Sequence, residues 1–238
     1  MAKKTTTQPA LGEYKRKRNF KKTPEPKAKP VKLGKPRKLR FCVQKHLASH
    51  LHYDFRLEHN GVLLSWAVPK GPSLNPRDKR LAMQVEDHPL EYRKFEGVIP
   101  EGYGAGIVML WDEGTWQPEV DDIDAALEKG DLKFALEGVK LKGSWVLVRT
   151  GGRGRANSDA RQWLLIKHRD EWAGDVNVID VAPLSVTTSR DLPEILAQAK
   201  PKIWKTYKPQ EGGGETGELR DQVVKRAVEL RAKKLARA

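Results

Sequence analysis

The chain has 238 residues, a net charge of +14 and a single cysteine, Cys42. This length is enough for one well-packed core with extensions. One cysteine excludes an internal disulfide, which fits a reducing compartment. The sequence has neither an apolar leader segment nor a run of about 18 apolar residues, which excludes a membrane-spanning helix. We therefore expect a cytoplasmic protein without a membrane partner.

The positive charge is concentrated at the two ends of the chain. Residues 1–40 hold 15 basic and 2 acidic residues, and residues 201–238 hold 10 basic and 5 acidic residues. The segment between them holds 20 basic and 24 acidic residues. Basic ends on a mildly acidic body are typical of proteins that bind nucleic acid through its phosphates. A solubilising tail without a partner is the alternative interpretation.

The composition divides the chain into three parts. Residues 1–40 contain five prolines and few apolar side chains, so we expect a basic, mostly disordered N-terminal arm. Residues 41–185 carry the signals of a folded β domain. Residues 186–238 are expected to form a basic C-terminal extension, with a short helix at 189–199 and a longer one at 218–236.

Short strands separated by tight turns make up the predicted β domain. Residues 52–58 alternate between polar and apolar as a strand does, and Asn60-Gly61 supplies a two-residue hairpin turn before a returning strand at 62–68. The other strands are predicted at residues 41–46, 81–88, 107–111, 115–116, 131–136, 139–141, 144–149 and 162–167, with one helix at 121–129. This pattern favours a mainly β fold, a small antiparallel β-barrel with short helices.

The strand period also groups the titratable side chains. The apolar residues of 52–58 face the core and its polar residues share the opposite face. The strand at 81–88 places Gln84, Glu86 and His88 on one face, and the first strand ends in a histidine. If these strands are neighbours, one polar pocket would hold the side chains of His46, His52, Asp54, Arg56, Glu86 and His88.

These residue types point to phosphoryl transfer. Two imidazoles and one carboxylate form a mixed nitrogen and oxygen ligand set that suits Mn²⁺, Fe²⁺ or Zn²⁺. Arg56 lies two residues beyond Asp54, and a guanidinium beside a metal can hold phosphate oxygens in pairs. The remaining histidine can serve as an acid or as a hydrogen-bond donor in the transition state.

Other interpretations stay open on these residues alone. An alternating face is also typical of the wet side of a strand with ordinary surface histidines. His52, Asp54 and His88 also match the H-x-D…H facial triad of non-haem iron oxygenases on β-barrels. A non-catalytic nucleic-acid-binding barrel would keep the fold and the basic ends without turnover.

Four more residues belong to the candidate pocket or its surroundings. Lys70 follows a strand and could reach a phosphate. Arg80 and Tyr92 flank the strand that carries the later histidine and could line the pocket. Cys42 has the same strand parity as His46, and we interpret it as a buried structural cysteine.

Six motifs, in this order, resemble the 3′-phosphoesterase domain of bacterial ATP-dependent DNA ligase D and its stand-alone relatives. The resemblance extends over roughly residues 11–185. It rests on FCVQKH at 41–46, LHYDFRLE at 51–58, SWAVPKGP at 65–72, VEDHPL at 85–90, FEGVIPEG at 95–102 and WLLIK at 163–167. The resemblance implies a small β-barrel enzyme that uses Mn²⁺ to heal 3′ ends for non-homologous end joining. Such an enzyme can remove a terminal ribonucleoside and then hydrolyse the 3′-phosphate that remains.

Carried over residue by residue, the resemblance implies a role for each site residue. The metal ligands would be His46, His52 and Asp54. The scissile phosphate would contact Arg56, Arg80 and His88, in a catalytic pocket that also contains Lys70, Glu86 and Tyr92. The 3′-terminal nucleoside would be engaged by Arg18 and Glu25, in a part of the arm that could order over the site.

Three features depart from the family pattern. Asn19 stands where the family usually has an acidic residue, which bears on ribonucleoside removal more than on phosphate removal. Tyr103 follows Gly102 directly, where many relatives have one more residue, in a glycine-rich stretch that we interpret as a sharp turn at the barrel rim. The sequence has no K-x-D-G ligase motif, so neither ATP use nor nick sealing is expected.

The expected partners follow from this interpretation. They are DNA or RNA–DNA primer–template 3′ ends, with a separate DNA ligase and an end-binding protein as further candidates. We expect a monomer. The basic C-terminal helix lies outside the matched region and has no assigned role.

Overall fold

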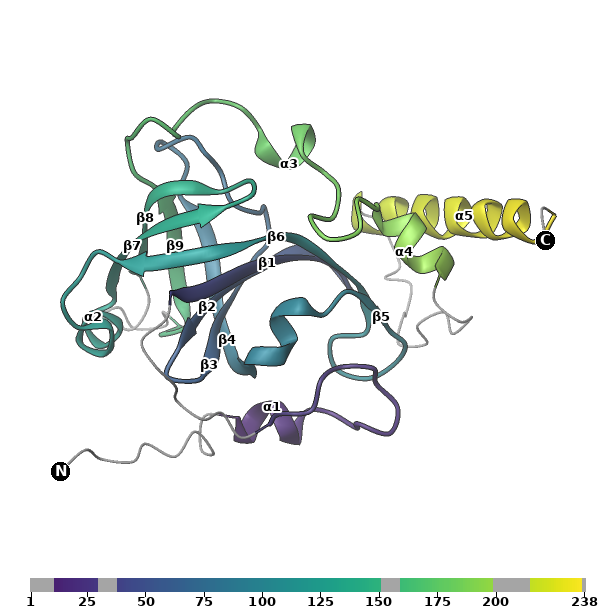
Figure 1. The fold of residues 1–238 in the computed structure, drawn as a ribbon, viewed down its shortest axis with the longest axis horizontal. Coiled ribbons are helices and arrows are strands. Elements are labelled where there is room, and N and C mark those ends of the chain that lie inside the picture. Colours follow the sequence, from purple (N-terminus) through teal and green to yellow (C-terminus); the bar gives the residue numbers. More distant parts are fainter. Residues whose placement is uncertain (1–10, 30–37, 151–158, 199–214, 237–238) are drawn as a thin grey trace.

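The computed structural model describes residues 11–29, 38–150, 159–198 and 215–236. In these residues nine strands form one antiparallel sheet in the order β1-β2-β3-β4-β9-β8-β7-β6-β5. Strand β1 also pairs with β6, which closes eight of the strands into a barrel, while β5 pairs with β6 (Figure 1). The predicted mainly β barrel is confirmed.

The strands agree with the predicted ones except around residues 111–116 and 137–142 and except for β5, which was not predicted. They are β1 Leu39–Leu47, β2 Leu51–His59, β3 Val62–Val68, β4 Arg80–Pro89, β5 Gly97–Ile99, β6 Gly106–Pro118, β7 Asp131–Gly138, β8 Lys142–Arg149 and β9 Gln162–Lys167. The helices are α1 Gly12–Arg16, the 3₁₀ helix η1 Leu90–Lys94, α2 Ile123–Lys129, α3 Val178–Val181, α4 Leu192–Gln198 and α5 Glu215–Leu235.

The hairpin of β2 and β3 forms as predicted and sets the register of the site. Asn60 and Gly61 both have positive φ, 46° and 80°, as a type I′ turn requires. On its other edge β2 pairs with β1, so that His46 lies directly opposite His52. The first strands therefore bring the predicted metal ligands together through backbone pairing alone.

Strand β6 is continuous where the sequence predicted two strands. The Asp112 carboxylate accepts hydrogen bonds from the backbone N–H groups of Glu113, Val139, Lys140 and Leu141. These bonds fix the turn between β7 and β8 beside β6. The pairing of β1 with β6 shifts register between Val43 and Gln44, which leaves Trp111 as an extra residue in β6. The turn therefore falls at residues 139–141 rather than at 137–138.

The face of β1 and β2 that carries the polar residues is buried, although alternation alone suggested a wet face. The opposite face packs into an aromatic core, in which Phe55 contacts Phe41 and Phe134. On the polar face, the side chain of Gln44 donates hydrogen bonds to the carbonyl oxygens of Tyr92 and Phe95. These bonds hold η1 against the sheet.

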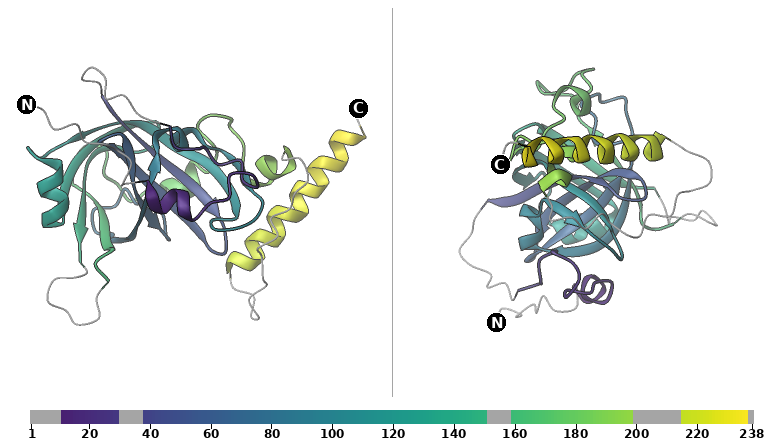
Figure 2. Two further views of the ribbon diagram at one scale, coloured as in Figure 1. Left: turned by 90° about the horizontal axis from the view of Figure 1, so that it is seen from below. Right: turned by 90° about the vertical axis from the view of Figure 1, so that its right-hand side faces the viewer.

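The N-terminal arm is ordered over residues 11–29, which differs from the expectation of a mostly disordered arm. Tyr14 of α1 is fully buried, and its hydroxyl donates to the carbonyl oxygen of Pro26 at 2.6 Å. Figures 1 and 2 show this purple segment lying along the barrel. A buried aromatic side chain gives the arm the apolar contact that its composition does not suggest. Residues 1–10 and 30–37 lie outside the described residues.

The C-terminal helices form where they were predicted. Helix α4 packs on β5 and β6, and α5 packs on α4, with Val223 and Ala227 buried (Figure 2). None of the helices in the described part of the chain is long and apolar enough to cross a membrane. The division of the chain at residue 185 stays a prediction.

Gly106 allows the start of β6 to approach the end of β1. A Cβ atom there would lie 2.3 Å from the carbonyl oxygen of Leu47 and 2.8 Å from Cα of Ala48, and φ is +156°. Because both contacts are with backbone, the two strands would have to separate. We predict that Gly106→Ala lowers the free energy of unfolding by about 2 kcal/mol or more, measured by urea denaturation.

The control is Gly174→Ala, since a Cβ at Gly174 meets nothing within 4 Å. This variant should unfold at the wild-type urea concentration. An unchanged midpoint for Gly106→Ala would show that the two strand ends are not held in contact.

Candidate metal centre and its covering arm

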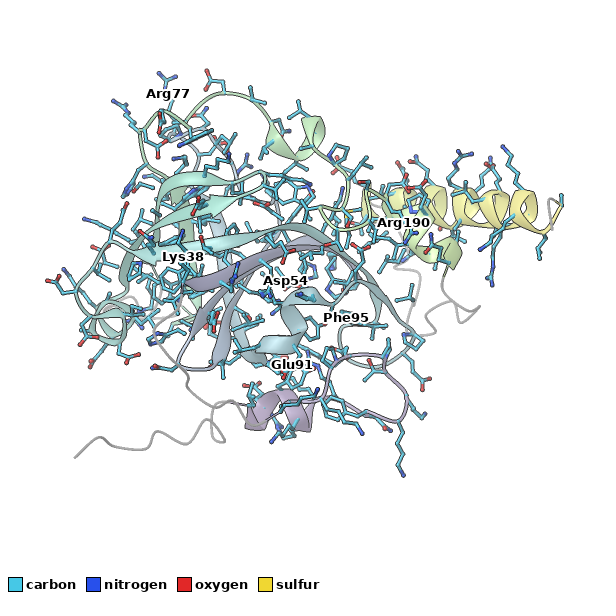
Figure 3. The ribbon with its side chains drawn as sticks, in the orientation of Figure 1. Lys38, Asp54, Arg77, Glu91, Phe95 and Arg190 are labelled. Carbon is cyan, nitrogen blue, oxygen red and sulfur yellow. The ribbon has the colours of Figure 1, made fainter. Side chains whose placement is uncertain are left out.

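His46, His52 and Asp54 form the one group of three or more possible metal ligands found in the described residues. One ligand atom from each lies within 4.8 Å of the others. Nδ1 of His46 is 3.4 Å and Nε2 of His52 is 3.7 Å from Oδ2 of Asp54. Asp54 comes from the middle of β2, and Figure 3 labels it together with Glu91 of η1.

On each imidazole the hydrogen bond is made by the nitrogen that points away from Asp54, so the nitrogen that faces Asp54 is available to a cation. Nε2 of His46 donates to the carbonyl oxygen of Gly104 at 3.0 Å. Nδ1 of His52 donates to the carbonyl oxygen of His50, also at 3.0 Å. In its neutral form each ring therefore directs an unprotonated nitrogen at Asp54, and three electron-pair donors converge. A carbonyl that accepts from the far nitrogen of a metal-binding histidine orients its ring, so the residues fit a divalent metal ion.

The Asp54 carboxylate is held in its charged form. Burial raises its pKa, but the charge of Arg56, joined by those of His52 and His46 when these rings are protonated, lowers it by more, so that the pKa lies well below its usual range. Nη2 of Arg56 is 3.2 Å from Oδ2 of Asp54. Burial also lowers the pKa of His52, which favours the neutral imidazole that a metal needs.

Arg56 is fixed by three different partners. Its side chain is 2% exposed. Nε donates to Gln44 at 2.8 Å and Nη1 donates to the hydroxyl of Ser65 at 2.7 Å, while Nη2 pairs with Asp54. The guanidinium also lies 4.9 Å from the centre of the Tyr92 ring. The structure thus brings Arg56 and Tyr92 to the pocket, as predicted.

His88 and Glu86 reach the same pocket from β4. The pairing of β3 with β4 is irregular between residues 85 and 88, and this reverses the strand parity there. Gln84 therefore lies on the face opposite His88, not on the same face as predicted, and it accepts a hydrogen bond from Trp163. Nδ1 of His88 donates to the carbonyl oxygen of Glu86 at 2.8 Å. Burial, followed by the charges of Arg56 and Arg18, lowers the pKa of His88 well below its usual value.

The arm places Arg18 over this pocket. Its guanidinium pairs with Glu86 at 3.0 Å and with Glu25 at 2.8 Å, and Nη2 donates to Nε2 of His88 at 3.1 Å. The side chain of Arg18 is 4% exposed. Tyr92 donates its hydroxyl hydrogen to Glu25 at 3.1 Å. The arm therefore supplies both of the arm residues that the sequence predicted for the site.

Lys70 and Arg80 make no described contact with His46, His52 or Asp54. They line a cavity of about 310 Å³ together with Pro69, Asp78, Lys79 and Leu81. Arg80 pairs with Asp78 at 2.8 Å. Val68 pairs with Tyr53, so Lys70 follows β3 at the end of the barrel where His52 lies. The structure therefore places both cations at that end without a contact to the ligands.

The geometry does not support the oxygenase alternative, and it agrees with the structural interpretation of Cys42. His88 binds Arg18 and lies outside the ligand group, so His52, Asp54 and His88 do not form the facial triad of an oxygenase. Burial raises the pKa of Cys42 to about 12. Cys42 is therefore the buried thiol that the sequence predicted.

Several residues of the site were not found by sequence reasoning. Gln44 could have been, because it has the same strand parity as His46. Ser65 lies opposite Arg56 in the register of β2 and β3. Predicting it as a site residue would require that register to be known. Tyr14 and Lys17 lie in the arm segment that was expected to order over the site, although neither was given a role of its own. The contact of the Gly104 carbonyl joins distant segments, and no sequence signal identifies it.

Comparisons with known proteins agree with this geometry. A family model described as the DNA Ligase D 3′-phosphoesterase domain matches residues 44–149. The multifunctional non-homologous end joining protein LigD of Pseudomonas aeruginosa is 50% identical over 210 residues, or 87% of this chain. The Mycobacterium tuberculosis LigD is 48% identical over 145 residues, or 60% of this chain.

The chain belongs to the DNA ligase D 3′-phosphoesterase domain family.

This phosphoesterase chain spans only part of its relatives. It covers 24% of the Pseudomonas protein and 18% of the Mycobacterium tuberculosis protein. The relative from Mycolicibacterium smegmatis is 36% identical over 82% of this chain, and 24% of its length is covered. The match thus concerns the phosphoesterase domain and its flanking segments.

Tyr14 anchors the arm on the phosphoesterase domain. Its ring contacts His88 and Tyr92, with centroids 5.1 Å and 6.1 Å away. We predict that Tyr14→Ala releases the arm, so that trypsin cleaves within residues 15–22 several times faster than in the wild type. Mass spectrometry of early digests would locate the cuts. Tyr14→Phe retains the ring and should show an intermediate rate. Unchanged cleavage in Tyr14→Ala would contradict the anchoring role.

Proposed function

We propose that this chain is a Mn²⁺-dependent 3′-phosphoesterase that removes 3′-phosphates from DNA or RNA–DNA ends. The observation that carries the proposal is the convergence of His46, His52 and Asp54 beside two buried arginines. Mixed nitrogen and oxygen ligands suit Mn²⁺. When bound, the ion would polarise a phosphate P–O bond.

The arginines would bind and orient the phosphate. A guanidinium carries five N–H donors. Since Arg56 gives one N–H from each nitrogen to Gln44, Ser65 and Asp54, one N–H on each terminal nitrogen remains for a phosphate oxygen. Arg18 lies on the same side of the pocket as His88. Lys70 and Arg80 would contact more distant phosphates of the strand, because they lie at the His52 end of the barrel.

His88 would handle a proton at Nε2. In the arm-docked state its Nδ1 proton is held by the Glu86 carbonyl and its Nε2 accepts from Arg18, so Nε2 carries no proton. A phosphate dianion beside Nε2 would favour the charged imidazolium. His88 would then gain a proton as the substrate binds and donate it from Nε2 to the departing oxygen.

The arm suggests where the end of the strand would bind. Arg18 and Glu25 are joined beside His88, which supports their role toward the 3′-terminal nucleoside. Asn19 is exposed, and its side chain accepts the N–H of Lys21. We therefore propose phosphate removal as the main activity, with ribonucleoside removal as a secondary one.

The cellular role follows from the relatives' names. They are non-homologous end joining proteins, and we propose that this chain acts in the same repair process in the cytoplasm. Its partners would be a separate ligase and an end-binding protein.

A phosphate-release assay tests the proposal. We predict that the protein releases phosphate from a primer–template with a 3′-phosphate when Mn²⁺ is present and not when a chelator is added. His52→Ala and Asp54→Ala should each lower the rate at least about 100-fold, as removal of a metal ligand does. His59→Ala is the control, since His59 contacts Asp124 outside the site.

The outcomes separate the candidate functions. Binding of the end without phosphate release would favour the non-catalytic barrel. Release that persists in both ligand variants would show that the chemistry occurs elsewhere.

A salt titration tests whether the arm contacts DNA. Lys15 and Lys21 are exposed cations of the arm. We predict that Lys15→Gln/Lys21→Gln weakens binding to a primer–template. The slope of log K against log salt should fall by up to about 0.9 for each phosphate that the two lysines neutralise in the wild type. Fluorescence anisotropy at several salt concentrations measures this slope.

The matched control neutralises two exposed lysines of α2 and β7, Lys129 and Lys133. This variant should bind with the wild-type slope. Equal slopes for the arm variant and the wild type would count against a DNA contact of the arm.

A further inference from the structure

We propose that the loop between β5 and β6, residues 100–105, couples the docking of the arm to the metal-binding histidine His46, with Tyr103 as the positioning residue. This inference rests on the metal site proposed above. It concerns a loop that the catalytic roles discussed so far leave unused.

The loop holds His46 through its backbone. The carbonyl oxygen of Gly104 accepts the Nε2 hydrogen of His46 at 3.0 Å. A Cβ on Gly104 would lie 3.9 Å from Cε1 of the same ring, so the backbone lies against the imidazole. Gly102 and Gly104 have φ of 90° and 75°, and the N–H of Ala105 donates to Gly102 at 3.2 Å. Tyr103 is therefore at the tip of a tight turn.

The arm contacts the other side of this turn. Nζ of Lys17 lies 4.5 Å from the centre of the Tyr103 ring, within cation–π range. The same atom lies 3.5 Å from the Tyr103 hydroxyl. Lys22 pairs with Glu101 at 3.0 Å. The loop thus lies between the arm and His46, with a contact on each side.

Packing against the core contributes little to the position of Tyr103. Its side chain belongs to a residue that is 50% exposed, so burial of its ring contributes little to the core. Its described contacts are with the cations of the arm, Lys17 at 4.5 Å and Arg18 at 5.8 Å from the ring centre. An exposed aromatic ring at the tip of a glycine turn suits a contact point for the arm.

The effect on metal binding follows from the direction of the His46 ring. The bond from Nε2 of His46 to the Gly104 carbonyl orients the ring with Nδ1 toward Asp54, and that carbonyl belongs to the loop. Loss of a group that orients a metal ligand weakens metal binding by roughly 10–100-fold. Tyr103 acts one step further away, so we expect a change of about 5-fold.

The coupling must also act in the reverse direction. If the docked arm strengthens metal binding, bound metal must strengthen arm docking by the same factor. Mn²⁺ should therefore slow tryptic cleavage within residues 15–22. A purely structural role of Tyr103 would not change this metal-dependent protection.

The experiment measures Mn²⁺ affinity and protection in the full chain. Free Mn²⁺ is followed by electron paramagnetic resonance during a titration of the wild type, Tyr103→Ala and Tyr103→Phe. The dissociation constant should rise about 5-fold in Tyr103→Ala and stay within about twofold in Tyr103→Phe, because phenylalanine retains the ring over Lys17. Protection from trypsin by Mn²⁺ should be reduced in Tyr103→Ala and retained in Tyr103→Phe.

Trp172→Ala is the matched control. Trp172 is 46% exposed and lies under a lysine, Lys142, with Nζ at 4.6 Å from the ring. It therefore repeats the same kind of contact away from the site. Its removal should leave Mn²⁺ affinity unchanged.

The outcomes separate this inference from the proposed function. Wild-type Mn²⁺ affinity in Tyr103→Ala would overturn the coupling, as would an equal loss in Trp172→Ala. Absence of saturable Mn²⁺ binding in the wild type, or its persistence in His52→Ala, would instead overturn the metal site itself.

Discussion

Asp54 carries a negative charge in the wall of the barrel, and the geometry of the site depends on how that charge is balanced. A buried ion loses the stabilisation of water and is tolerated only with well-placed partners. Arg56 is the permanent cationic partner, and the imidazoles of His46 and His52 add to it when they are protonated; together they keep the pKa of the carboxyl well below its usual range despite burial. Arg56 is held in turn by neutral side chains of β1 and β3. The pocket is therefore a fixed arrangement of charges.

The arm adds a second layer of charge to this arrangement. Glu25 lies on the arm and Glu86 lies on β4, and both side chains are almost fully buried. Arg18 joins them, since its guanidinium pairs with both carboxylates. The two acids would repel each other in a buried pocket without this cation. The register of the arm on the barrel is thus determined by charge as well as by the buried ring of Tyr14.

The sequence predicted the ligands more completely than their environment. A strand period of two places His52, Asp54 and Arg56 on one face, and antiparallel pairing then brings in His46. The pattern could not show that this face is buried, because η1 and the arm that cover it are distant in the chain. Arg80 illustrates the same limit. Its pairing with Asp78 two residues away could not be foreseen from its position beside the strand or from the resemblance that grouped it with the site.

The cations of the pocket are already paired with carboxylates, so a phosphate that draws one of them away must replace a carboxylate partner. The adjacent residues Lys17 and Arg18 show how this exchange can occur without leaving a carboxylate unpaired. If Arg18 turned toward a substrate, Glu86 would lose one partner. Lys17 already binds the other oxygen of Glu86 at 3.1 Å. In spite of burial, a backbone hydrogen bond and the hydrogen bonds from Arg18 and Lys17 hold the pKa of this carboxyl below its usual value. The carboxylate would therefore stay compensated during the exchange. On the proposed function, two neighbouring cations let the arm give one to the phosphate without leaving an unpaired buried charge, the outcome that costs most.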